Sequence, residues 1–561
     1  MKNNIKIIIS VCLMTMMFSA CEFLDETPSA ILTPDQVKTD YEGALIAAYS
    51  MLGNDHYDSP FSLWPYGTVR SDDAYKGGSG AGDISAFHFF EISSNIPTTL
   101  GETDVLWYNC YVAISRANTA INTIRLADDF DGKNARIAEA RFLRGHFYFL
   151  LKILFKNIPY VDETIPVADY GTISNVALSN DELWQKIAED FKFAEENLPA
   201  TQPEVGRANK YAAAAYLAKI YLYKAYRQDN PETHEVTSVS AADLEEALQY
   251  ADEVIGSQYG LEDDFAYNFL PGEFENGKES IFAVQFSTDD GTQFGRVNFG
   301  DLLSVPMGLG CCDFLKPSQN LVNAFSTQNG LPSFAGFNTL NSGYAEQNDP
   351  RLFHTVALPG LPYKYNTELV YQEDWNRNPG YYGNYASLKE NVDPGCDCFV
   401  PMVPFYANTK NRIVLRYSDV LLMKAEALIE LHRQNEALPF INQVRQRAKN
   451  STGYVSYINH KINIDAYKDG TNCTWTEEFA RQALRWERRL ELAMEHQRFF
   501  DLVRWGIADE ALNGFYQTES PRRDYYAGAK FTKNKHEYVP VPEQQIKFSK
   551  YLYKQNIGYN N

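Results

Sequence analysis

The strongest constraint on the fold of this chain is a series of long segments with helical periodicity. In residues 241–257, Leu244, Leu248, Ala251 and Ile255 form one apolar stripe at helical spacing. Each such stripe needs a neighbouring helix to cover it, and short turns join consecutive segments, so the pattern predicts packed helix pairs. No strict repeat of about 34 residues is visible, so the array is tetratricopeptide-like rather than a consensus repeat. The expected helical segments are 104–127, 137–155, 181–199, 208–226, 241–257, 416–432 and 436–448.

Two regions of different texture interrupt the helical pattern. Between about 258 and 415, Gly, Pro, Asn and aromatic residues are frequent, and only residues 280–288 read as a strand. Residues 54–102 have the same character. Long irregular stretches in a compact protein are usually functional. The sequence therefore predicts a mainly α fold, with a helical scaffold over about 30–257 and 416–561, and with loop-rich insertions carrying a ligand site.

The first twenty residues have the layout of a secretory signal peptide. Two lysines precede an apolar run that is shorter than the ~20 residues a bilayer requires, and Ser19 and Ala20 precede Cys21. This ending resembles the bacterial lipobox, in which the cysteine receives a lipid, whereas the alternative is an ordinary signal peptide with an incidental cysteine. Glu22, Asp25 and Glu26 resemble the surface-export signal of Bacteroidetes lipoproteins. We expect residues 1–20 to be removed and the mature chain, 21–561, to be anchored through Cys21.

Charge limits the classes of ligand. The formal charge is −21, and removal of a leader with two lysines and no acids makes it −23. Such a chain is a poor candidate for binding nucleic acid, and a neutral ligand is favoured over an anionic one. No catalytic or nucleotide-binding motif stands in a suitable context, so we expect no enzyme activity and no cofactor.

Six cysteines remain in the mature chain besides Cys21, and two groups of them are unusual. They are the adjacent pair Cys311–Cys312 and the pair Cys396 and Cys398. No histidine stands at zinc-like spacing near either group, so a disulfide or buried thiols are expected rather than a metal site.

Six segments, in order along nearly the whole mature chain, make it similar to the SusD/RagB family of Bacteroidetes outer-membrane lipoproteins. Lys156 and Asn157 depart from the family's usual Phe-Gly segment. The resemblance implies a single SusD-like domain that is displayed at the cell surface. It also implies that the protein captures oligosaccharides, or peptides in RagB-type members, for a SusC-like TonB-dependent transporter. The six segments are "CEFLDETP" (21–28), "ARFLRGHFYFLLKILFKNIPYV" (140–161), "RANKYAAAAYLAKIYLY" (207–223), "RYSDVLLMKAEAL" (416–428), "ERRLELAMEHQRFFDLVRWG" (487–506) and "YVPVPEQQI" (538–546).

A glycan site needs flat aromatic rings beside polar groups that bind hydroxyls, and two loop regions offer both. Aromatic residues make up 14% of the chain, which suits sugar-stacking surfaces and large helical cores equally. The expected ligand-binding residues are Asp55, Trp64, Asp72 and Asp73 in the first region, Trp375, Arg377, Tyr381, Tyr382 and Tyr385 in the second, and Cys311 and Cys312 beside them.

Three other functions stay open beside glycan capture: peptide binding, a surface glycosidase and a purely structural lipoprotein. A glycosidase needs a pair of carboxylates in a cleft. Glu487, Glu491 and Glu495 are spaced at four-residue steps among many arginines. That spacing favours an ion-paired helix face that locks the scaffold over a catalytic pair.

Overall fold

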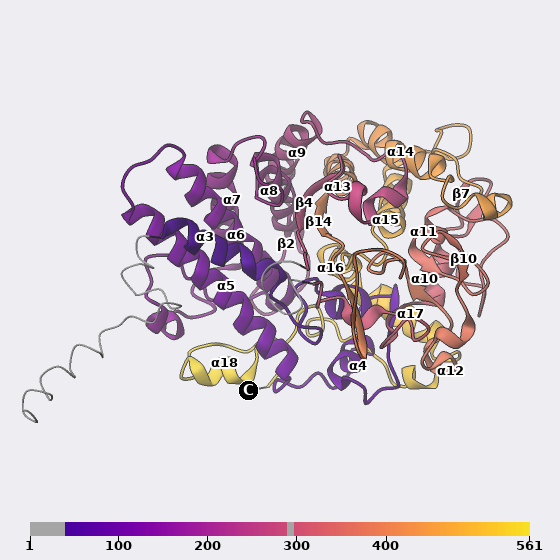
Figure 1. The fold of residues 1–561 in the computed structure, drawn as a ribbon, viewed down its shortest axis with the longest axis horizontal. Helices are drawn as coiled ribbons and strands as arrows, with labels where there is room; N and C mark the ends of the chain where they lie inside the picture. The colour runs from indigo at the N-terminus through magenta and orange to yellow at the C-terminus, as the bar shows by residue number, and fades with distance from the viewer. Residues whose placement is uncertain (1–39, 289–296, 561) are drawn as a thin grey trace, which may run out of the picture.

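The computed structural model describes residues 40–288 and 297–560, so the leader and Cys21 lie outside the described residues. In Figure 1 most helices of the first half form one side of the molecule, and the short strands and loops form the other together with the helices of the second half. Helices pack on their neighbours in chain order from α5 to α9, and α13 then packs on α9. The array thus continues across an insertion of more than 150 residues. Its helices are α3 (Tyr41–Tyr49), α5 (Gly101–Leu126), α6 (Lys133–Phe155), α7 (Asn180–Asn197), α8 (Lys210–Ala225), α9 (Ala241–Ile255), α13 (Tyr417–Glu430), α14 (Gln434–Asn450) and α15 (Glu477–Glu491).

All seven expected helices are present, with ends displaced by a few residues at most. Local chemistry explains their positions. Ser179 forms a reciprocal capping box with Glu182 at the start of α7. The alanines of α8 are buried, which permits close packing of neighbouring helices. An ideal Cβ at Gly145 of α6 would lie 2.6 Å from the Phe191 ring of α7, so glycine is required for this helix contact.

The loop-rich half contains seven two-stranded sheets within the described residues, far more strand than the sequence predicted. Most strands have only two to five residues, which is too short to show an alternating pattern. The segment expected at 280–288 forms β4 (Ser280–Val284), which pairs with β14 (Arg412–Arg416) immediately before α13. The insertion therefore leaves and rejoins the helical array at one place. The other paired strands are β1 (Ala74–Gly77) with β5 (Phe314–Pro317), β2 (Tyr226–Arg227) with β3 (Ser238–Val239), β6 (Thr327–Gln328) with β7 (Leu331–Pro332), β8 (Val356–Ala357) with β11 (Ala386–Ser387), β9 (Pro362–Tyr363) with β10 (Asn366–Val370), and β12 (Phe399–Met402) with β13 (Phe405–Asn408).

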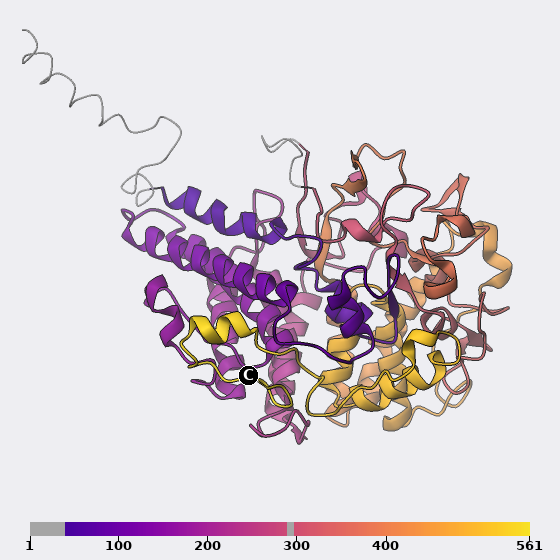
Figure 2. The same cartoon turned by 90° about the horizontal axis from the view of Figure 1, so that it is seen from below.

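The C-terminal segment returns to the first helices. Figure 2 shows α18 (Glu543–Phe548) lying along α5 on the helical side. Gln545 donates a hydrogen bond of 2.8 Å to Asp104 of α5, and the Val539 amide donates to the Leu154 carbonyl of α6. The C-terminal segment therefore joins the second half of the chain to α5 and α6, in addition to the pairing of β4 with β14.

Buried ion pairs join the insertion to the helices. The Glu491 carboxylate, at the end of α15, pairs with Arg351 of the insertion, with Arg416 at the end of β14 and with Arg447 of α14. Burial opposes ionisation, but the three guanidinium groups hold the pKa of Glu491 well below its usual range. The expectation of ion pairing is confirmed for Glu487, Glu491 and Glu495, and the first two are buried instead of lining a surface. The expected regular spacing ends there, because α15 ends at Glu491 and Glu495 lies before α16 (Arg498–Arg504).

We expect Glu491→Gln to lower the free energy of unfolding by about 3 kcal/mol, because Arg351, Arg416 and Arg447 each lose one of their buried carboxylate partners. Urea denaturation followed by circular dichroism measures the loss. Glu478→Gln, at an exposed position of the same helix, is the matched control and should change stability little. Equal stability of the two variants would show that the network does not join the halves energetically.

Candidate functional site

The first predicted loop region contributes buried structural residues. Trp64 is 1% exposed, its indole N–H donates to the Gly300 carbonyl at 2.9 Å, and its ring packs edge-on against Phe87 and Phe314. Asp55 is also buried, accepts the Phe61 amide hydrogen bond at 2.7 Å and lies 3.5 Å from the Arg412 guanidinium. Neither side chain presents a free face to solvent in this structure.

Asp72 and Asp73 are committed to arginines of the last helices. Asp72 accepts two hydrogen bonds from Arg498, and Asp73 accepts one from Arg489. Burial opposes ionisation of Asp72, but Arg489 and Arg498 together hold the pKa of this carboxyl well below its usual range. Both carboxylates therefore fasten the start of β1 to the C-terminal helices.

The second predicted region lies at the surface of the loop-rich half, where three loops meet. We call residues 76–84, 306–313 and 373–385 together the loop surface. Arg377 forms an ion pair of 2.9 Å with Asp83, and the Asn378 amide donates to the Ser79 carbonyl at 2.9 Å. Lys76 donates to two carbonyls of its own loop, at Gly80 and Asp83. These bonds fix the first and third loops against each other.

Two glycines bring the middle loop against aromatic rings. An ideal Cβ at Gly308 would lie 2.3 Å from the indole of Trp375, and one at Gly310 would lie 2.2 Å from the ring of Tyr406. Only a glycine backbone can approach either ring so closely. The Met307 amide also donates to the Trp375 carbonyl at 2.9 Å. The segment from Met307 to Cys311 therefore lies between the two rings.

The cysteines of both unusual pairs form disulfides, Cys311–Cys312 and Cys396–Cys398. Cys311 is half-buried beside Gly310 and Cys312 is buried. The disulfide alternative is thus the observed one. Tyr406, against Gly310, stacks on Phe399 at 5.3 Å, and Phe399 directly follows the second disulfide.

The tyrosines of the third loop divide into exposed and buried members. Tyr381 is half-exposed and stacks on Tyr525, with ring centroids 4.5 Å apart. Tyr382 and Tyr385 are buried, and the Tyr385 hydroxyl donates to Gln319 at 2.7 Å. Trp375 and Arg377 keep part of their surface exposed. The structure therefore brings Cys311, Trp375, Arg377 and Tyr381 to the loop surface, with Cys312, Tyr382 and Tyr385 beneath it.

Four residues were missed by the sequence reasoning: Asp83 and Met307 within the loop surface, and Tyr406 and Tyr525, whose rings pack against it. The glycines of "VPMGLGCC" were the available signal, because closely spaced glycines indicate a close approach of backbone to another group. Tyr525 could not be found in this way, since it comes from the C-terminal region, 144 positions after Tyr381.

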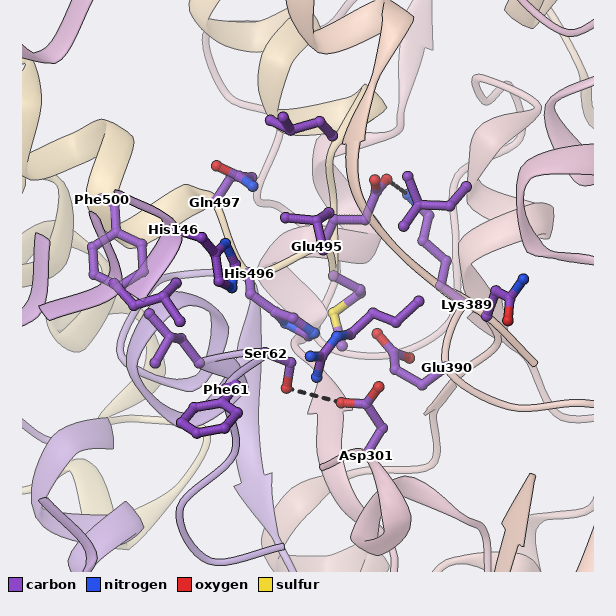
Figure 3. A pocket seen from close by; sticks show the side chains of 18 of the residues that line it. Phe61, Ser62, His146, Asp301, Lys389, Glu390, Glu495, His496, Gln497 and Phe500 are labelled. Carbon is purple, nitrogen blue, oxygen red and sulfur yellow. Dashed lines mark hydrogen bonds and ion pairs between the residues drawn. The ribbon is translucent and has the colours of Figure 1, made fainter. Parts of the chain in front are cut away.

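A cavity of about 120 Å³, which we call the central cavity, lies where the helical array meets the loop-rich half. Figure 3 shows polar side chains that point into it from several elements, among them Asp301, Glu390 and His496. Burial lowers the pKa of His496 to about 4 and that of His146, on α6, to about 3, so both imidazoles are neutral near pH 7. Burial and the nearby Asp301 carboxylate raise the pKa of Glu390 to about 7.

Metal and membrane features were searched over the same residues. Within residues 40–288 and 297–560, no three or more His, Cys, Asp and Glu side chains are grouped so that they could hold a metal ion. Among the helices of this described part, none combines the length and apolar character needed to cross a bilayer.

The architecture is that of a mainly helical protein built on helix pairs, with a loop-rich second half. The SusD family model matches residues 278–559, and a model described as "Starch-binding associating with outer membrane" matches residues 23–222. The chain belongs to the SusD family. Members of this family are non-catalytic binding proteins, so the chain is a binding protein and not an enzyme. The family binds glycans and is associated with the outer membrane.

Relatives and solved structures resemble the chain over nearly its whole length. SusD-like protein P2 of Formosa agariphila is 25% identical and aligns over 99% of each chain, and a SusD-like protein of Bacteroides ovatus is 24% identical over 97% of this chain and 96% of its own. A SusD homolog from Bacteroides thetaiotaomicron superimposes with a TM-score of 0.70 at 22% identity, covering 94% of this chain and 99% of its own. A structure described as a laminarin binding SusD-like protein gives a TM-score of 0.65 at 21% identity, covering 93% of this chain and 99% of its own. These structural similarities establish the fold.

The ionisation of Glu390 predicts a pH dependence of stability. Its raised pKa means that the folded protein keeps a proton which the unfolded chain loses near pH 4.5, so the stability from this group falls as pH rises from about 4.5 to 7. We expect Glu390→Gln to lack this loss, and to gain about 1–3 kcal/mol relative to the wild type between pH 5 and pH 8. Urea denaturation of both proteins at pH 5 and at pH 8 measures this change in relative stability. A constant difference between the two proteins would contradict the raised pKa.

Proposed function

We propose that this protein is a cell-surface lipoprotein, anchored through Cys21, that captures a neutral glycan at its loop surface and passes it to a SusC-like TonB-dependent transporter. The observation that carries the proposal is the arrangement of Trp375, the Cys311–Cys312 disulfide and Tyr406 around one glycine-rich segment. A partly exposed indole offers an apolar face to a sugar ring, and the neighbouring Arg377–Asp83 pair offers groups that bind hydroxyls.

The comparisons support the same ligand class. One structural neighbour is described as laminarin binding and another as surface glycan-binding protein A from Bacteroides thetaiotaomicron, the latter with a TM-score of 0.63 at 20% identity over 94% of this chain and 99% of its own. Glycan capture by this chain rests on the family and on the loop surface together. The net charge of −21 favours a neutral glycan.

The proposal assigns different roles to the two predicted regions. Trp375, Arg377, Tyr381 and Cys311 contact the glycan, while Cys312, Tyr382 and Tyr385 support them from below. Asp55, Trp64, Asp72 and Asp73 position the scaffold, since each is buried and bonded to another part of the chain.

The first test is a titration of the soluble chain, starting at Glu22, against neutral and anionic polysaccharides, with product analysis of the same samples. We expect binding to a neutral glycan without cleavage. Trp375→Ala should weaken it about tenfold or more, because it removes the central aromatic face. Binding of peptides alone, or cleavage of a glycan, would overturn the proposal.

A second test moves the Trp375 ring without removing it. Gly308→Ala places a methyl group where the indole lies, so the ring must shift, and we expect affinity for the same glycan to fall several-fold while the far-ultraviolet circular dichroism spectrum is retained. Gly514→Ala is the matched control, because an ideal Cβ there meets no atom within 4 Å. Wild-type affinity of Gly308→Ala would show that the glycan does not use this ring.

A further inference from the structure

The central cavity is distinct from the loop surface in position and in lining. Its walls come from α6 and α8 of the helical array, from β14, and from the segment between α15 and α16. None of the predicted loop-surface residues lines it. At about 120 Å³ it is well below the roughly 300 Å³ of pockets for larger ligands, so it can hold one small molecule or several waters.

Several charged groups at the cavity are paired with other groups of the protein. Lys389 pairs with Glu495 at 2.6 Å and also donates to the Glu491 carbonyl. Lys219 pairs with Asp419 and donates to Gln497. The Asp301 carboxylate accepts hydrogen bonds from Ser62, drawn in Figure 3, and from Asn298. These groups fix the walls of the cavity and do not require a ligand as a partner.

Three other ionisable groups at the cavity have unused hydrogen-bonding capacity. Glu390 is 6% exposed, points into the cavity in Figure 3, and has one carboxylate oxygen, Oε2, without a hydrogen-bond partner. Lys410 is 7% exposed, and its ammonium makes no hydrogen bond or ion pair with any residue that the structure describes. One guanidinium nitrogen of Arg412, Nη1, also has no hydrogen-bond partner, although it lies 3.5 Å from Asp55.

In a mostly buried site, each polar atom left without a hydrogen bond costs about 1–3 kcal/mol, so the unpartnered atoms of these three groups favour a polar occupant. The Asp301 carboxylate opposes an anion, and Lys410 and Arg412 oppose a metal cation. A hydroxyl group suits all three, because it donates to a carboxylate and accepts from an ammonium or guanidinium. The rings of Phe61, Phe149 and Phe269 on the walls suit the C–H faces of a sugar ring.

We infer that the central cavity is a second binding site, which takes a single monosaccharide whose hydroxyls bridge Glu390, Lys410 and Arg412. This site is independent of glycan capture at the loop surface. Because its walls come from both halves of the molecule, an occupant there binds the helical array to the insertion, and it stabilises the folded protein by mass action.

The test uses the full mature chain and D-glucose, D-mannose, D-fructose and glycerol as probes, with saturation-transfer NMR for affinity and soaked crystals for position. We expect one of the sugars to bind saturably, with difference density in the cavity. Trp375→Ala should leave this affinity unchanged. Lys410→Met and the near-isosteric Glu390→Gln should each lower it at least tenfold.

Glu510→Gln, at an exposed position of α17 (Ala508–Glu519), is the charge control and should bind like the wild type. Three results would overturn the inference: no saturable binding of any sugar, density for water alone in the soaked crystals, or glycerol binding as tightly as every sugar. Loss of monosaccharide binding in Trp375→Ala would assign it to the loop surface instead. Failure of polysaccharide binding leaves this site untouched, so the two proposals fail separately.

Discussion

The structure depends on the buried carboxylate of Glu491 and its three arginines. Arg351 belongs to the insertion, Arg416 ends the strand that returns from it, and Arg447 belongs to the helical array. Such a network is an uncertain source of net stability, because desolvation of the charges offsets much of their attraction. Its value lies in specificity, because Glu491 contacts all three arginines only when the two halves are arranged as they are here. The loops that form the loop surface are therefore carried on a fixed base, although they contain little regular structure of their own.

The helices could be predicted from the sequence because their signal is local. Periodicity, the Ser179 cap and the alanines of α8 all lie within the segment that they define. The small sheets could not be predicted, since strands such as Ala74–Gly77 and Phe314–Pro317 pair across 240 positions and each is too short to show alternation. The same limit affected the charged segment after Trp486, where residue spacing indicated ion pairing but not that the charges are buried between two halves.

Of the two predicted regions of the candidate site, one is partly exposed and the other is buried, and the reason is related. Aromatic and acidic residues in a loop have the same sequence signature whether they face solvent or the core. Trp64 and Trp375 illustrate this, since both stand in glycine- and tyrosine-rich loops, yet one donates to a backbone carbonyl in the core and the other lies partly exposed against Gly308. A buried loop residue is distinguished from an exposed one by its partner elsewhere in the fold, which the local sequence does not reveal. For Asp72 that partner is Arg498, more than 400 positions later.

Glycines shape the loop surface, whereas charged side chains shape the central cavity. At the loop surface, Gly308 and Gly310 let the backbone lie against aromatic rings, because neither residue has a Cβ atom that would overlap the ring. At the central cavity, shape is set by satisfied ion pairs, and the groups left over are Glu390, Lys410 and Arg412. Trp375, Arg377 and Tyr381 keep part of their surface exposed on the loop surface, whereas the central cavity offers about 120 Å³ between the two halves of the molecule. Under the two proposals, the loop surface takes part of a longer glycan and the cavity takes a single sugar.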